Sequence, residues 1–462
     1  MTIPLPVPAP LDPNFQPLVL VWRAYQQDVT KATHSQRFVC AIERSGGALS
    51  PWEACIFPDD VQTSRTVQLL DRVIKSLLWC RGGFRIHVSG SRAVYEHLKA
   101  AYQPAGARAF DAAFMARVYE RPFEVLWTDN GDSIAQAKEF PSAVGRHLNG
   151  CRIGFDAGGS DRKVSAVIDG QAVYSEEVVW HPKITADPRY HYEGILSAMQ
   201  TAASHMPRVD AIGVSSAGVY VDNRIMVASL FLQVSPEDFD RHVKTMYIDI
   251  AKRLGDVPLV VANDGDVTAL AGAMNLNAGN VLGIAMGTSE AGGYVDRQMH
   301  ITGWLNELAF VPVDYSPESM VDEWSGDYGC GVKYFSQDGA IKLASAAGIP
   351  LDADLSPAEK LKVIQQHLAE GHQGARRIFE TIGIYFGYAV AYYSMFYQVE
   401  HVLIMGRVTS GQGGPLILEN AQKVLDQVFP ELARSIQLHI PDEKSRRVGQ
   451  SVAAASLPEI GE

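Results

Sequence analysis

An apolar run that ends in an acid and two glycines constrains this chain more than any other stretch. Residues 152–157 read Arg-Ile-Gly-Phe-Asp-Ala, then Gly158, Gly159 and Ser160 follow, and a β-rich stretch resumes. This order predicts a strand, a tight turn and a second strand, with the glycines at the tip, where positive φ and close backbone approach cost least. Backbone N–H groups at such a tip form an anion-binding concavity, and Asp156 could hold a Mg²⁺ that accompanies phosphates. Gly-Gly between strands is more often only a turn, so the remaining motifs must decide.

The composition is that of an ordinary globular protein with more than one domain. The chain has 462 residues, of which 47% are hydrophobic and 20% charged, and this length predicts two or three domains. The formal net charge of -12 argues against binding to nucleic acid or to an anionic membrane, because phosphate-rich surfaces attract clustered Lys and Arg. We therefore expect neither nucleic acid nor a membrane among the partners.

Three further features bear on location. The five cysteines are scattered and form no C-x-x-C pair, which is typical of reduced, buried thiols. The proline-broken start lacks the basic region of a signal peptide. Residues 378–397 are long and apolar, but Glu380 and several tyrosines within them favour a buried helix over a membrane span. Together these features predict a cytoplasmic protein.

The first third of the chain, residues 1–148, is expected to form a small α/β domain of its own. Its apolar and β-branched runs predict strands at residues 18–22, 38–42, 54–57, 84–88 and 123–127. Helical spacing of apolar residues predicts helices at residues 66–80, 91–102 and 133–148. A strand separates the two best helices, so no helix-turn-helix is expected, and no catalytic signature is present.

Further apolar strands after residue 151 end in small, hydroxyl or acidic residues. Residues 209–218 end at Gly218, and residues 258–264 end in the pair Asn263-Asp264 before another helix. Ligands of open α/β sheets bind outside the carboxyl ends of strands, so Asp264 is well placed for chemistry. A second hairpin design and a glycine-terminated strand follow, with the residues Gly287, Thr288, Ser289 and Gly406.

The order and content of these motifs resemble the actin, sugar kinase and Hsp70 superfamily, and within it the ROK family of repressors and sugar kinases. The resemblance covers the chain from residue 150 to residue 460. It implies an α/β fold of two ribonuclease-H-like subdomains around a cleft, residues 149–275 and residues 276–462. Residues 1–148 would then be an N-terminal α/β extension of unknown role.

The resemblance also implies a role for each motif. Asp264 matches the catalytic base and Asp156 the acid that orients Mg²⁺, usually through water. Gly158, Gly159 and Ser160 match the first phosphate loop, Gly287, Thr288 and Ser289 the second, and Gly406 the nucleoside motif; Asn263, Glu307 and Gly218 match substrate contacts. Simpler interpretations remain open: Asp264 as a helix N-cap, Asp156 as a turn-stabilising acid and Glu307 as a solvated loop acid.

The chain departs from the family pattern around the sugar and zinc motifs. The family histidine that binds zinc and touches the sugar is replaced by Phe310, and the cysteine-rich zinc segment keeps only Cys330, with Val332 where a glutamate is usual. A structural zinc needs about four ligands, so we expect no zinc. Arg407 and Ala217 also replace a usual glycine and proline. We therefore expect an acceptor other than glucose.

These motifs predict an ATP- and Mg²⁺-dependent kinase that phosphorylates a hydroxyl of a sugar, a sugar derivative or a polyol. The family also suggests a homodimer. The alternative is a non-catalytic sugar- or nucleotide-binding sensor of the ROK type, which the altered sugar motif favours and the retention of Asp264 and Asp156 opposes. A repressor is less expected, because the N-terminal third shows no basic face.

Overall fold

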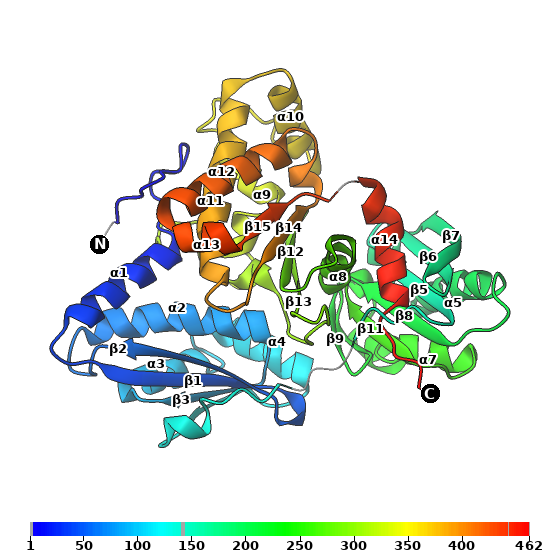
Figure 1. Ribbon diagram of the computed structural model, residues 1–462, viewed down its shortest axis with the longest axis horizontal. Helices are drawn as coiled ribbons and strands as arrows, with labels where there is room; N and C mark the ends of the chain where they lie inside the picture. Colours follow the sequence, from blue (N-terminus) through cyan, green and yellow to red (C-terminus); the bar gives the residue numbers. More distant parts are fainter. Residues whose placement is uncertain (1–2, 140–143, 442, 462) are drawn as a thin grey trace. The chain divides into compact units, whose positions relative to one another are not determined.

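The computed structural model describes residues 3–139, 144–441 and 443–461 (Figure 1). The chain divides into two compact units. Unit 1 contains Met1–Phe140, Ile284–Gly292 and Trp304–Ile440, and unit 2 contains Pro141–Gly283, Gly293–Gly303 and Pro441–Glu462. The grouping differs from the expected division in two respects, because the N-terminal region joins the C-terminal half of the chain and the last residues return to unit 2.

Unit 2 is built on a five-stranded sheet in the order β11-β8-β5-β6-β7. Strands β11, β8 and β5 run parallel, and β5, β6 and β7 form an antiparallel meander. The strands and helices of the unit are β5 (Cys151–Ala157), β6 (Asp161–Ile168), β7 (Gln171–Val179), α5 (Pro188–Ala203), β8 (Ala211–Ser216), β9 (Val219–Val221), β10 (Arg224–Val227), α6 (Pro236–Asp238), α7 (Met246–Arg253), β11 (Leu259–Asn263), α8 (Asp264–Leu276) and α14 (Glu443–Ala455). A π-helical turn, Phe239–Val243, lies between α6 and α7.

Alternation along β5 assigns the two faces of this sheet. Ile153 and Phe155 are fully buried in a core that also takes side chains from α5 and α7. The opposite face is covered by the C-terminal helix α14, whose backbone lies directly over two glycines. A Cβ on Gly154 would lie 1.9 Å from the Ser451 carbonyl oxygen, and one on Gly213 would lie 1.7 Å from that of Ala454. Because Gly154 and Gly213 have no side chain, α14 can pack directly on the sheet. This contact returns the end of the chain to unit 2.

The N-terminal part of unit 1 is a four-stranded sheet in the order β2-β1-β3-β4, with α2 along one face (Figure 1). Its elements are α1 (Leu18–Lys31), β1 (Gln36–Glu43), β2 (Leu49–Ile56), α2 (Thr63–Arg81), β3 (Arg85–Ser89), α3 (Arg92–Ala101), α4 (Ala109–Tyr119) and β4 (Glu124–Trp127). The strand expected at residues 18–22 was wrong: this run begins α1, because a short apolar run fits a buried helix as well as a strand. The helix expected at residues 133–148 was also wrong over the residues described there, and α4 was missed.

The remainder of unit 1 contains the sheet β13-β12-β14-β15, although β12 and β13 continue across the unit boundary. Its elements are β12 (Val281–Met286), β13 (Glu290–Val295), α9 (Gln337–Ala344), α10 (Pro357–Ala369), α11 (Gln373–Tyr393), β14 (His401–Met405), α12 (Gly413–Val428), α13 (Pro430–Ser435) and β15 (Gln437–His439). Helix α11 is the expected buried helix, and sixteen of its residues are buried. In the described part of the chain, no helix is both long enough and apolar enough to cross a membrane.

The close packing of α14 on glycine predicts a stability effect. We expect Gly213→Ala to destabilise the protein by about 1–3 kcal/mol, because the added methyl group overlaps a helix backbone that cannot bend away locally. Urea unfolding and hydrogen exchange of α14 measure the effect. Gly449→Ala is the control within α14, since its Cβ would meet nothing closer than Ala271 Cβ at 3.9 Å. Equal stability of the two variants would contradict the proposed close contact.

Candidate functional site

The carboxyl ends of three parallel strands in unit 2 carry the expected acids. Asp156 lies near the end of β5 beside Ser215 of β8, and Asn263 ends β11 beside Ser216 of β8. Asp264 follows as the first residue of α8. The structure therefore brings the predicted metal acid and the predicted base to one edge of one sheet.

Asp156 is a buried carboxyl with neutral hydrogen-bond donors and no ion pair within the described residues. Ser215 Oγ donates to its Oδ1 at 2.8 Å, and Gln450 Nε2 from α14 donates at 3.4 Å. Only 6% of the residue is exposed. Burial raises the pKa of Asp156 from 3.8 to about 6; the hydrogen bond from Ser215 opposes this rise, and the negative charge of Asp264 adds to it. The site thus keeps an acid that the fold does not neutralise.

Asn263, rather than Asp264, caps helix α8. The Asn263 side chain accepts the Gly265 N–H at 2.7 Å and donates to the Gly218 carbonyl at 2.7 Å. The simpler interpretation of Asp264 as the N-cap is therefore wrong, although Asp264 Oδ1 also accepts the Gly265 N–H at 3.0 Å. Burial raises the pKa of Asp264, while the Gly265 amide and the positive charge of Lys183 oppose the rise.

The first glycine motif forms the expected hairpin tip between β5 and β6. Neither Gly158 nor Gly159 has a positive φ, so that part of the expectation was wrong. Buried Trp180 holds the tip from the side, because its N–H donates to the Ser160 carbonyl at 3.1 Å and its Nε1 to the Gly158 carbonyl at 2.8 Å. Lys183 extends over Gly159, where an added Cβ would lie 2.9 Å from its Nζ. Sequence analysis missed both residues, because nothing in their local pattern marks them.

The second glycine motif lies in unit 1, between β12 and β13. The Gly287 N–H donates to the Ser289 carbonyl at 2.9 Å, which closes a tight turn with exposed Thr288 and Ser289. Gly406 has φ of 100° and follows β14 directly. A Cβ on Gly406 would lie 2.4 Å from the Met286 carbonyl oxygen, so its backbone rests against the residue before Gly287. The expected phosphate loop and nucleoside glycine are therefore neighbours.

Glu307 also lies in unit 1, directly before a 3-10 turn, Leu308–Phe310. A second acid near it, Glu290, was not predicted, because no local pattern distinguishes it from the β-forming residues around it. Glu290 is 2% exposed and accepts the Tyr393 hydroxyl at 3.3 Å, while its Oε2 has no partner among the described residues. Burial raises the pKa of Glu290 to about 8; the Tyr393 hydrogen bond opposes this rise, and the charge of Glu307 adds to it.

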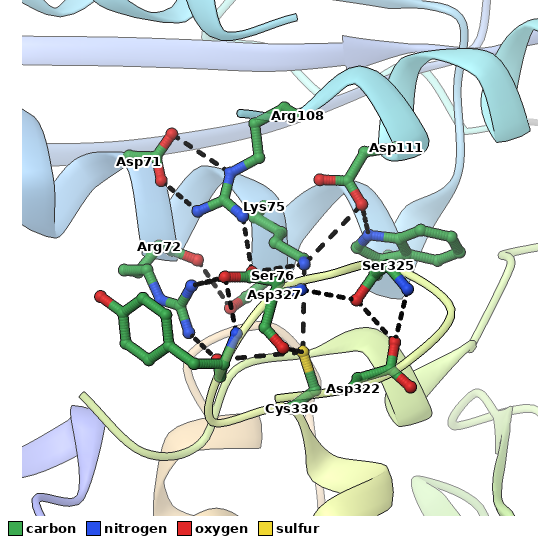
Figure 2. Close-up of polar contacts among 12 residues, drawn as sticks. Asp71, Arg72, Lys75, Ser76, Arg108, Asp111, Asp322, Ser325, Asp327 and Cys330 are labelled. Atoms are coloured by element: carbon green, nitrogen blue, oxygen red, sulfur yellow. Dashed lines mark hydrogen bonds and ion pairs between the residues drawn. The ribbon is translucent and has the colours of Figure 1, made fainter. Parts of the chain in front are cut away.

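A buried ion-pair cluster lies beside Cys330, the one cysteine that remains of the expected zinc segment (Figure 2). Asp327 lies 2.6 Å from Arg72 Nη1, 2.6 Å from Lys75 Nζ and 2.5 Å from Arg108 Nη1. Burial opposes ionisation of this carboxyl, but the three cations hold its pKa well below the usual range. Cys330 Sγ is buried 4.0 Å from Lys75 Nζ. Over the described ranges, no group of three or more His, Cys, Asp or Glu side chains could hold a metal ion.

The expected site residues thus fall into two groups, one in each unit. Unit 2 holds the acids, the first glycine tip, Asn263 and Gly218, and unit 1 holds the second glycine tip, Gly406 and Glu307.

No protein-family model and no curated protein matches the sequence. Among solved structures, a ROK family glucokinase from Streptomyces griseus in complex with glucose and AMPPNP aligns with a TM-score of 0.50 and 20% identity, over 67% of this chain and 99% of that chain. A ROK hexokinase from Thermus thermophilus aligns with a TM-score of 0.51 and 17% identity, over 66% and 97%. A ROK family transcriptional regulator, a homologue of the E. coli Mlc protein, aligns with a TM-score of 0.50 and 18% identity, over 67% of this chain and 79% of that chain. The expected α/β fold of the ROK type is confirmed; identities this low show the fold alone.

The unpaired burial of Asp156 predicts a pH-dependent stability cost. Its pKa of about 6 in the folded state lies above its ordinary value of 3.8, so the folded state binds more protons between these values and loses stability as pH rises through them. We expect Asp156→Asn to remove this cost and to gain about 1–3 kcal/mol over the native chain at pH 7.5, with little difference at pH 4. Urea unfolding across this pH range, without divalent cations, measures it. A constant difference at all pH values would contradict the assignment.

Proposed function

We propose that this chain is an ATP-dependent kinase that phosphorylates a hydroxyl of a sugar, a sugar derivative or a polyol. The observation that carries the proposal is the pair of carboxyls, buried Asp156 and half-buried Asp264, at the carboxyl edge of a sheet beside a glycine hairpin tip. That arrangement occurs on a fold of the ROK type, and one structure with this fold is a glucokinase in complex with glucose and AMPPNP.

Asp264 is the proposed general base. It would accept the proton of the acceptor hydroxyl as that oxygen attacks the terminal phosphoryl group. Burial raises its pKa toward the working pH, which strengthens it as a base, while the Gly265 N–H fixes the carboxylate in position. Asn263 links the start of α8 to the Gly218 carbonyl, so we propose that it orients the loop beside the acceptor.

Each unit offers a candidate group of phosphate-binding donors of its own. Amides at Gly158–Ser160 and the positive charge of Lys183 are available in unit 2, and the turn at Gly287 with the Thr288 and Ser289 hydroxyls is available in unit 1. Asp156, with its hard carboxylate oxygens, suits Mg²⁺, which is commonly bound through one or two carboxylates plus the substrate phosphates. When bound, Mg²⁺ would neutralise developing charge on the phosphoryl oxygens.

The second candidate is a sensor without catalysis, because a ROK family transcriptional regulator shares the fold equally well. The energetics of the two acids argue against it. Both carboxyls have raised pKa values, so each destabilises the folded protein at neutral pH. A sensor gains nothing from that cost, whereas phosphoryl transfer needs both a base and a metal acid.

Asp264→Asn tests the proposed base. We expect it to lower kcat by about 10²–10⁴-fold, because the general base is lost while the shape is kept. ADP release across a panel of sugars, amino sugars and polyols measures turnover, and calorimetry measures nucleotide and acceptor binding, which should change by less than about threefold. The control is Asp249→Asn, a half-exposed acid on α7. Loss of binding with an intact fold would overturn the role, and sugar binding without ADP release in the native chain would favour the sensor.

Gly287→Ala tests the second phosphate loop. Its Cβ would meet only the Ser289 carbonyl oxygen, at 3.7 Å, so we expect the melting temperature to change by less than about 2 °C. The methyl group would stand where a phosphate approaches the backbone, and we expect the KM for ATP to rise by about tenfold. Gly461→Ala, with nothing within 4 Å, is the matched control. An unchanged KM for ATP would remove this turn from the nucleotide site.

A further inference from the structure

The end of helix α2, in the N-terminal region, is bonded to the segment that carries Glu307. The N–H groups of Leu305, Asn306 and Glu307 donate to the carbonyls of Arg81, Cys80 and Trp79, at 3.2, 3.1 and 3.1 Å. These are carbonyls at the end of a helix, which have no partner within the helix itself. The backbone of the expected acceptor segment is therefore fixed by residues that lie outside the stretch resembling the ROK family.

Gly82 shapes this junction. It ends α2 with φ of 72°, in the left-handed region that favours glycine, and its N–H closes the helix on the Leu78 carbonyl at 2.7 Å. A Cβ on Gly82 would lie 2.9 Å from Leu305 Cβ and 2.2 Å from the Tyr119 hydroxyl. The absence of a side chain thus lets the acceptor segment reach the helix end.

Arg81 holds the segment through its side chain as well. Its buried guanidinium lies 3.5 Å from the centre of the Trp304 ring and 5.1 Å from that of Tyr397, and its Nη2 donates to the Phe396 carbonyl. The Tyr397 hydroxyl in turn donates to Asn306 Oδ1 at 3.0 Å. Arg81, at the end of α2, therefore contacts Trp304 directly and is linked to Asn306 through Tyr397.

The far end of the segment packs on the same helix. The Phe310 ring lies 4.3 Å from the Trp79 ring of α2, and 5.4 and 6.3 Å from the Phe110 and Phe114 rings of α4. Trp79 is fixed by its Nε1 bond to Asp111 Oδ1 at 2.9 Å. Phe310 is one of the residues that depart from the family pattern, and the N-terminal region supplies the aromatic side chains that receive it.

A second contact fixes the chain next to this segment. The Val313 N–H donates to the Gly329 carbonyl at 2.8 Å, and the Gly331 N–H donates to the Val311 carbonyl at 2.9 Å. This pairing lies beside Asp327, which is held by the buried cations of α2 and by Arg108 (Figure 2). The segment that carries Glu307 and the segment that carries Cys330 are therefore both anchored on α2.

We propose that the N-terminal region is an integral part of the acceptor half of the site, in which α2 positions Glu307 and Arg81 is the positioning residue. The inference rests on the proposed function, which assigns Glu307 to the acceptor. It gives residues 1–140 a role in substrate alignment, through packing and hydrogen bonds, rather than the role of a separable sensing domain. Loss of the Arg81 contacts should therefore affect the acceptor and spare the nucleotide.

The test compares Arg81→Ala with Arg81→Lys and a matched control in the full chain. The control is Arg23→Ala, because Arg23 also lies in the N-terminal region, donates to a carbonyl (Val428, 3.0 Å) and lies over an aromatic ring (Phe429, 5.7 Å). For Arg81→Ala we expect amide exchange in residues 303–308 to accelerate by about tenfold or more, with little change for Arg23→Ala. The KM for the acceptor should rise by about tenfold, while the KM for ATP stays within about twofold.

Arg81→Lys keeps the charge but lacks the planar group, so it should give intermediate exchange and an intermediate acceptor KM. If Arg81→Ala does not fold, Arg81→Lys provides the test in its place. Unchanged exchange in residues 303–308, or equal changes in the KM values for acceptor and ATP, would overturn the positioning role. If the native chain releases no ADP with any acceptor, the proposed function fails, and the exchange experiment still decides whether Arg81 holds the segment.

Discussion

A charge that is removed from water has to be paired, and in unit 1 this requirement joins parts of the chain that are far apart in sequence. Helix α2 carries buried Arg72 and Lys75 against the sheet of the N-terminal region, and their partner, Asp327, lies 255 residues beyond Arg72. Removing Asp327 would leave the buried Arg72 guanidinium without a carboxylate partner among the described residues. If the N-terminal region separated from the C-terminal half, these charges would either be exposed to solvent or stay buried without Asp327 as their ion-pair partner.

Unit 2 shows the opposite treatment of charge. At one sheet edge Asp156 is buried and Asp264 is half-buried, and neither has a cation in hydrogen-bond contact among the described residues. The pKa values of both carboxyls are raised. Asp327 is also buried, but its cation partners lower its pKa. Acids whose pKa values are strongly perturbed are typical of functional sites. In unit 2 the two acids lie in the motifs that resemble those of the ROK family.

The success of prediction followed the range of the interactions involved. Both glycine tips and the strand that ends at Asn263 were predicted, because turn residues and β-branched runs act within a few positions. The assignment of residues 18–22 as a strand failed, since an apolar run of five residues does not reveal its period.

The sequence by itself determined the α/β class, the two glycine hairpins, and the acids Asp156 and Asp264 at strand ends, because each depends on local backbone geometry. Only the tertiary structure decided that Asn263 caps α8, that Trp180 and Lys183 lie against the first hairpin tip, and that Glu290 is buried beside the second. It also decided that α14 returns to unit 2 and that α2 holds the segment of Glu307. These contacts join residues that are distant in sequence, and their partners are chosen by space and burial rather than by any local pattern.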